Sequence, residues 1–148
     1  IHLIDVAPST DDVTVGFRIQ TGGSTWQTSG YAYVGHINGV ASGADLSYSI
    51  DSNTAYVPVT RAPAGAGAGL GSSAGEVAGS ELHINRPGST VIKSVEIVTR
   101  YNRASDGILQ RTEFGGYYGS NSFWTGLRIF VSSGTLATGS FILYGLRK

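Results

Sequence analysis

The 148-residue chain contains no cysteine and no methionine. Without cysteine it can form no disulfide, no thiolate metal site and no cysteine nucleophile. Because translation starts with methionine, a chain that begins at Ile1 is expected to be a processed product or a segment of a longer protein. Its start also lacks the charged, apolar and small-residue succession of a signal peptide.

Charged residues are scarce, at 14% of the chain, where about 25% is typical. Ten basic and ten acidic side chains cancel, and no run of like charges occurs. A nucleic-acid binder needs a basic patch, so we expect no nucleic-acid partner. The longest apolar runs, at 127–131 and 141–146, are far shorter than the roughly 20 residues that span a bilayer, so no membrane insertion is expected.

The pattern that is present is alternation of apolar and polar residues, which is typical of β-strands with one buried face. Every second position from Val13 to Ile19 is apolar, and the turn sequence Thr21-Gly22-Gly23-Ser24 follows. Similar alternating or β-branched runs recur along the chain. They predict about ten short strands, at 1–6, 13–20, 31–37, 46–50, 54–59, 81–85, 90–101, 108–114, 123–131 and 140–146.

Glycine, asparagine, serine and proline separate these runs, and 22 residues are glycine. Many short strands with tight turns and no intervening helices favour a sandwich or a jelly roll. We therefore predict an all-β fold: one antiparallel β-sandwich domain, jelly-roll-like, over residues 1–148. Segment 62–75 is Gly/Ala-rich and has few side chains to bury, which predicts a long surface loop or an extended arm.

Motifs of catalysis are missing from the sequence. The alternating glycines at 65–71 do not keep the spacing of a phosphate-binding loop, and no strand-to-helix context surrounds them. No Gly-x-Ser-x-Gly elbow marks a serine nucleophile. The three histidines, His2, His36 and His83, are isolated and lack the spacing of a metal site. We predict no catalytic residue, no metal site and no cofactor.

Asp5, Asp11 and Asp12 form the densest acidic group. Close carboxylates are ligands that Ca²⁺ takes, and one of them could act as a general acid. We favour a turn in which these aspartates cap backbone amides, and the sequence leaves Ca²⁺ binding open. A glycan-degrading enzyme would need two carboxylates about 5 to 10 Å apart in a cleft. The other candidates for such a pair are Asp45, Asp51, Glu96 and Glu113.

Aromatic side chains gather near turns that are rich in Gly, Ser and Asn. Trp26 follows a Gly-Gly turn, while Tyr117, Tyr118 and Trp124 flank a turn that contains Asn121. Such rings make a flat, polar surface that stacks on sugars or packs on a partner protein. These five residues are our candidate binding residues. The alternative, which we favour for most of the rings, is that they fill the core or a subunit interface.

The last stretch contains Leu127-Arg128, Ser133-Gly134, Leu136, Thr138-Gly139 and Leu143-Tyr144-Gly145. This succession resembles the C-terminal hairpin of a widespread group of phage and prophage virion proteins. Earlier segments resemble turns and a tyrosine strand of the same group, in the same order, so the likeness spans nearly the whole chain. These segments are Pro8-Ser9-Thr10-Asp11, Gly22-Gly23-Ser24-Thr25-Trp26, Ser29-Gly30-Tyr31-Ala32-Tyr33 and Asn85-Arg86-Pro87-Gly88-Ser89-Thr90.

The resemblance implies a structural protein on the exterior of a bacteriophage virion and transfers no catalytic residue. A displayed domain of the tail-fibre or receptor-binding type would recognise a host surface, with glycan as the expected ligand. The alternative is a capsid decoration or head-spike protein that stabilises or adorns the shell, and a glycan-degrading enzyme is the least favoured. We expect contacts with other virion proteins and a homo-oligomer, with a trimer favoured, because virion fibres and spikes are commonly symmetric.

Overall fold

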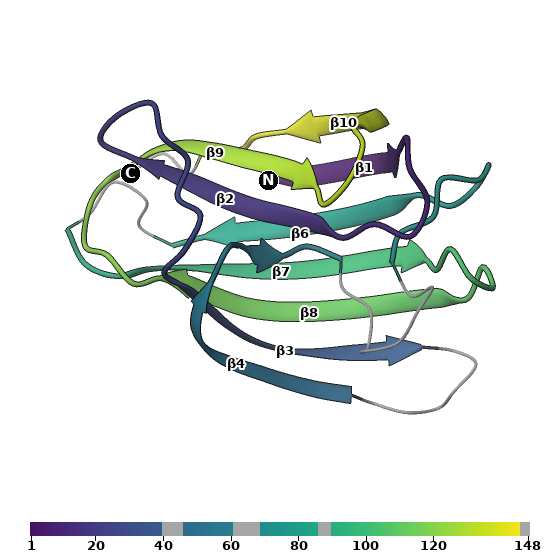
Figure 1. Ribbon diagram of the computed structural model, residues 1–148, viewed down its shortest axis with the longest axis horizontal. Coiled ribbons are helices and arrows are strands. Elements are labelled where there is room, and N and C mark those ends of the chain that lie inside the picture. The colour runs from purple at the N-terminus through teal and green to yellow at the C-terminus, as the bar shows by residue number, and fades with distance from the viewer. Residues whose placement is uncertain (40–45, 61–68, 86–89, 146–148) are drawn as a thin grey trace.

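The computed structural model describes residues 1–39, 46–60, 69–85 and 90–145, with the backbone alone for 46–53. Within these residues there is no helix, and so none that could cross a membrane. Strands make up the fold (Figure 1). The ten strands are β1 (His2–Pro8), β2 (Val15–Thr21), β3 (Tyr31–Gly39), β4 (Leu46–Thr54), β5 (Val57–Pro58), β6 (Ala78–Ile84), β7 (Lys93–Asn102), β8 (Leu109–Tyr118), β9 (Trp124–Val131) and β10 (Leu136–Ile142).

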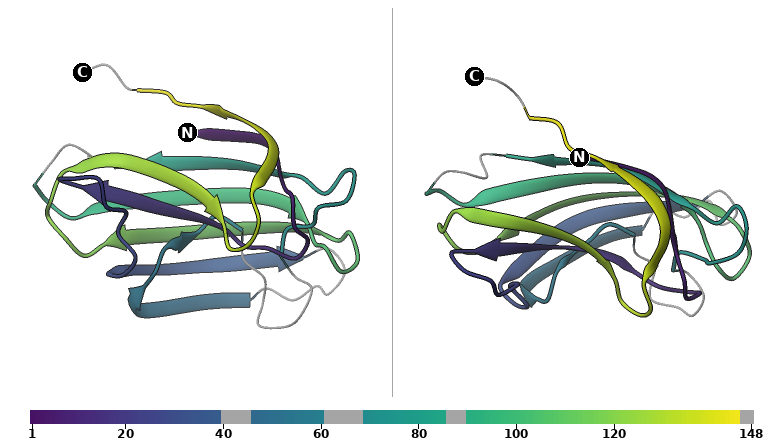
Figure 2. Two further views of the ribbon diagram at one scale, coloured as in Figure 1. Left: turned by 45° about the horizontal axis from the view of Figure 1, so that its top comes forward. Right: turned by 90° about the horizontal axis from the view of Figure 1, so that it is seen from above.

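Two antiparallel sheets of unequal size pack face to face. The large sheet has seven strands in the order β10-β1-β6-β7-β8-β3-β4, and the small sheet has three, in the order β5-β2-β9. The small sheet lies in front of the large one in Figure 1, and the two layers are seen from above in Figure 2. The predicted antiparallel β-sandwich is confirmed.

Alternating side chains from both sheets fill the space between the layers. In β6 and β7 every second residue is buried, and the residues between are mostly exposed. Phe17 and Ile19 of β2 belong to the same buried cluster as Leu82, Ile97 and Phe114 of the large sheet. Each such side chain contributes roughly 1.5 to 3 kcal/mol when it leaves water, so this interior is the main source of stability.

The first two strands pair with the last two through the corner between the sheets. β1 pairs with β10 in the large sheet, and β2 pairs with β9 in the small one. In the crossing segments, the Ser9 N–H donates to the Thr135 carbonyl (2.8 Å), and the Ser132 N–H donates to the Thr14 carbonyl (2.9 Å). Figure 2 shows the two chain segments descending side by side. This paired crossing gives the sandwich its jelly-roll-like character.

Two expectations for the C-terminal stretch are wrong. The strand predicted at 140–146 lies at Leu136–Ile142, and β9 and β10 do not pair with each other as a hairpin. Backbone pairing with β1 fixes β10, from Leu136 opposite Pro8 to Ile142 opposite His2. The apolar side chains that suggested the later strand continue past this pairing, and at 143–145 they are exposed.

The Gly/Ala-rich segment predicted at 62–75 is described from Gly69 onward, and 62–68 lie outside the described residues. The prediction of a surface loop or arm is wrong at Leu70, whose side chain is fully buried. The Leu70 N–H donates to the Val13 carbonyl (2.8 Å), and the Val13 N–H donates back (3.2 Å). One large apolar side chain among small ones is enough to anchor the segment.

We predict that Leu70→Ala lowers the free energy of unfolding by about 2 to 5 kcal/mol, because it leaves a cavity in the core. The matched control is Leu109→Ala on β8, where the side chain is half-exposed and the change should stay within about 0.5 kcal/mol. Denaturant unfolding measures both. Equal losses in the two variants would contradict an anchoring role for Leu70.

Candidate functional site

The five predicted binding residues do not share one surface. Trp26 lies beside Gly126 and Arg128 on the outer face of the small sheet. Tyr117 is exposed on the outer face of the large sheet, and Asn121 is exposed in the turn between β8 and β9.

Trp124 packs against the core. Its ring centroid lies 5.9 Å from that of Phe17, and it belongs to the partly buried side chains that line the central cluster. Its buried Nε1 has no hydrogen-bond partner among the described residues. Trp124 therefore contributes chiefly to packing.

Tyr118 is tied into a polar network beside the core. Its ring lies 5.2 Å from the ring of Tyr31, and its hydroxyl donates to Oε1 of Gln27 (3.0 Å). The Tyr31 hydroxyl accepts from the Ile19 N–H (2.9 Å) and donates to the Gln27 carbonyl (3.2 Å). These bonds hold the connection between β2 and β3 against β8, so the Tyr118 hydroxyl is already used by the fold.

The acidic turn acts as a cap. Oδ1 of Asp11 accepts from the Ser72 N–H (3.0 Å), and Oδ1 of Asp12 accepts from the Gly69 N–H (2.8 Å). Asp11 and Asp12 therefore have the capping role that we favoured from the sequence. Asp5 instead lies within β1. Across the described ranges, no three His, Asp or Glu side chains lie close enough together to hold a metal ion.

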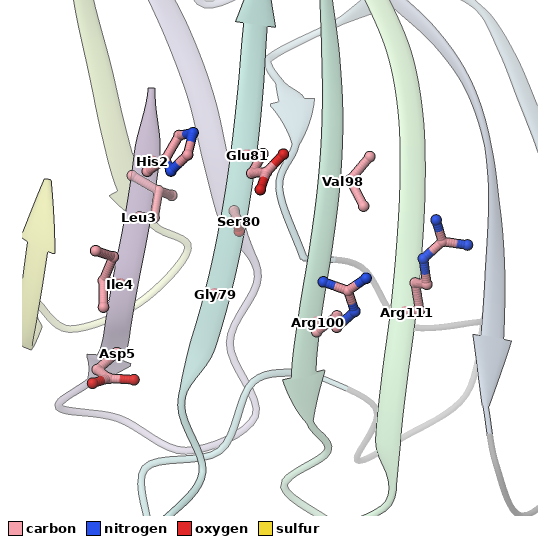
Figure 3. A pocket seen from close by; sticks show the side chains of 10 residues that line it. All are labelled: His2, Leu3, Ile4, Asp5, Gly79, Ser80, Glu81, Val98, Arg100 and Arg111. Carbon is pink, nitrogen blue, oxygen red and sulfur yellow. The ribbon is translucent and has the colours of Figure 1, made fainter. Parts of the chain in front are cut away.

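A groove crosses β1, β6, β7 and β8 on the outer face of the large sheet (Figure 3). Asp5 and Glu81 line the groove with carboxylates, and Arg100 and Arg111 line it with guanidinium groups. Gly79 lines it with backbone alone. Arg111 also forms an ion pair with Glu113. Opposite charges are therefore balanced in this groove, which suits a polar ligand without selecting its charge.

Sequence reasoning did not identify Glu81 as a residue of the groove that Asp5 also lines. Both line it because β1 pairs with β6, with His2 opposite Glu81 and Val6 opposite Ala78. No local sequence signal marks this pairing.

A second surface, also missed, covers the outer face of the small sheet. Arg18 of β2 lies directly opposite Arg128 of β9. The Trp26 and Phe130 rings lie next to these arginines, and the Tyr56 ring packs edge-on against Phe130. We call these five residues the arginine–aromatic face. Of these five residues, only Trp26 was among the candidate binding residues predicted from the sequence.

The third exposed feature is the C-terminal ribbon, residues 136–145. β10 is the outermost strand of the large sheet, and almost all of its residues are exposed. Exposure reaches 50% for Phe141, 73% for Leu143 and 63% for Tyr144. The Tyr144 ring lies edge-on to His2 with centroids 5.1 Å apart, which holds the end of the ribbon beside β1.

Burial raises the pKa of the Tyr31 hydroxyl above its ordinary value of about 10. A pKa raised by folding stabilises the fold fully below the unfolded pKa, and this contribution is lost as pH rises through the folded pKa. We predict that the unfolding free energy falls as pH increases above about 10, and that Tyr31→Phe flattens this fall.

Denaturant unfolding from about pH 8 to about pH 11 measures the pH dependence. The control is Tyr117→Phe, which removes an exposed hydroxyl and should keep the wild-type slope. A Tyr31→Phe slope equal to that of wild type would contradict the assignment.

Comparisons with protein-family models, curated proteins and solved structures found no match. Function is therefore inferred from the residues and from the geometry of their side chains.

Proposed function

We propose that the chain is an exterior domain of a phage virion, of the tail-fibre or receptor-binding type. In this proposal it has a binding role without catalysis, it assembles with copies of itself, and it recognises glycan on a host surface. The single observation that carries the proposal is the exposed C-terminal ribbon.

The ribbon has the properties of an assembly surface. Its sequence, from Leu136 to Gly145, contains no charged residue, and large apolar side chains are exposed along its second half. Contiguous exposed apolar side chains mark interaction sites, and the centres of interfaces are depleted in charge and enriched in Phe and Tyr. An outermost strand also presents unpaired backbone groups to another chain.

A second copy of the chain is the partner that fits this surface best. In a two-fold dimer the same patch of each subunit meets itself, whereas in a ring such as a trimer a patch meets a different surface of the next subunit. An uncharged apolar ribbon can pack on itself or on another uncharged surface. A trimer, as expected for a fibre or a spike, would bring three ribbons toward one axis.

The ribbon also supports the resemblance to phage virion proteins. Leu143 and Tyr144 of the Leu-Tyr-Gly motif are exposed more than any other large apolar side chain in the described residues. A motif that fills the interior would be buried. Exposure instead favours a role in contacts between subunits of a particle.

We predict that the wild-type protein forms a homo-oligomer at micromolar concentration and that a triple variant, Phe141→Ser with Leu143→Ser and Tyr144→Ser, sediments as a monomer. Because these side chains are exposed, the free energy of unfolding should change by only about 0.5 kcal/mol per substitution. Sedimentation velocity measures assembly, and denaturant unfolding checks the fold.

The control is Val34→Ser, which removes an equally exposed apolar side chain on β3, far from β10 in the strand order. This variant should assemble as wild type does. A wild-type protein that is monomeric throughout the micromolar range would contradict self-assembly through the ribbon.

Immunogold labelling of particles that carry the chain tests its location. Label on tail tips or fibres is expected. Label confined to heads would favour the decoration or head-spike alternative, and particles without any external label would contradict a displayed virion domain.

A further inference from the structure

The outer face of the small sheet carries an arrangement that works against stability. Arg18 and Arg128 are directly opposite on neighbouring antiparallel strands, and like charges in that position repel each other. Among the described residues, neither arginine forms an ion pair with a carboxylate. In the part of the chain that the structure describes, the strands thus hold two positive charges together with no carboxylate paired to either.

Aromatic rings orient the two guanidinium groups. Cζ of Arg18 lies 4.3 Å from the centroid of the Phe130 ring, and its Nε donates to the Ala55 carbonyl (2.9 Å). Cζ of Arg128 lies 5.9 Å from the ring centroids of both Trp26 and Phe130. Attraction between cation and ring holds each group near the sheet, so the remaining N–H donors of the arginines stay available at the surface.

Two glycines allow the rings to lie close against the strands. A Cβ at Gly16 would meet ring carbons of Phe130 at 2.8 Å and of Tyr56 at 2.9 Å. A Cβ at Gly126 would meet Oε1 of Gln20 at 2.7 Å and the Trp26 ring at 3.4 Å. Because residues 16 and 126 have no side chains, the rings can lie directly against the backbone of β2 and β9, next to the two arginines.

We infer that the arginine–aromatic face binds an acidic saccharide, a sugar that carries a carboxylate. This inference rests on the proposed function and names the class of glycan that the domain recognises. A planar guanidinium matches a carboxylate with two parallel hydrogen bonds. A carboxylate between Arg18 and Arg128 would also compensate their mutual repulsion.

The rings supply the second half of the recognition. Sugar rings have apolar C–H faces that pack on aromatic surfaces. Trp26 and Phe130 lie next to Arg128, and Tyr56 packs against Phe130. The groove of the large sheet lacks this combination, because its acids, Asp5 and Glu81, balance its bases. The charge and the rings together favour the small sheet as the site for an acidic sugar.

The test is a titration of the wild-type protein with four matched oligosaccharides, followed by calorimetry or by chemical-shift changes. One contains uronic acid, the second has the same sugars with each carboxylate reduced to an alcohol, the third is neutral, and the fourth is phosphorylated. We expect binding of the uronic-acid oligosaccharide, at least a tenfold weaker affinity for the reduced form, and weaker binding as salt concentration rises.

Arg128→Gln should weaken the binding of the uronic-acid oligosaccharide at least tenfold, and Arg18→Lys should also weaken it, because lysine keeps the charge but loses the planar fork. Arg128 is exposed and its variant removes the repulsion between the two arginines, so the variant should melt no lower than the wild-type protein. The matched control is Arg100→Gln in the groove of the opposite sheet, which should bind as wild type does.

Three results would overturn the inference: equal binding of the reduced oligosaccharide, tighter binding of the phosphorylated one, or unchanged affinity in Arg128→Gln. If the wild-type protein binds host cells but none of the acidic oligosaccharides, the inference fails and the proposed function stands. If it binds neither, glycan recognition itself fails. Sedimentation velocity tests assembly independently of sugar binding, because Arg128→Gln does not change the C-terminal ribbon.

Discussion

Backbone pairing between the beginning and the end of the described chain holds the two layers of this protein together. β1 and β2 run beside β10 and β9, and hydrogen bonds continue through the corner where the chain changes sheets. Without β9, β2 would keep only the two-residue strand β5 as a partner in the small sheet. Two paired strands alone are marginally stable in water. The small sheet that covers the core therefore depends on the pairing of β2 with β9.

The same pairing creates both surfaces for which we propose a function. It sets Arg18 opposite Arg128 on the outer face of the small sheet, and it extends β10 along the free side of β1. The two surfaces therefore belong to one continuous pair of chain segments, on opposite sides of the corner. In the function that we propose, glycan recognition and contact with other subunits would therefore be separated in space within one small domain.

Local alternation was sufficient to predict the fold class, since it reports which face of a strand is apolar. Val15, Phe17 and Ile19 are buried as expected. It could not distinguish Trp124, which packs on Phe17, from Trp26, which lies on an outer face, because that depends on the partner strand. For the same reason no local signal predicts a pair such as Arg18 and Arg128, whose register is set by residues far apart in the chain.

The pairing of distant segments also governs how the chain reaches its native state. Gln20 and Gly126 become strand partners only after the whole sequence between them has been synthesised. Loops of this length close at a large entropic cost, and sheets built from non-local contacts fold in roughly milliseconds to seconds. A nascent chain that ends before β9 therefore leaves β2 with only β5 as its strand partner in the small sheet and leaves Phe17 without the Trp124 ring. Productive folding waits for the last strands to emerge.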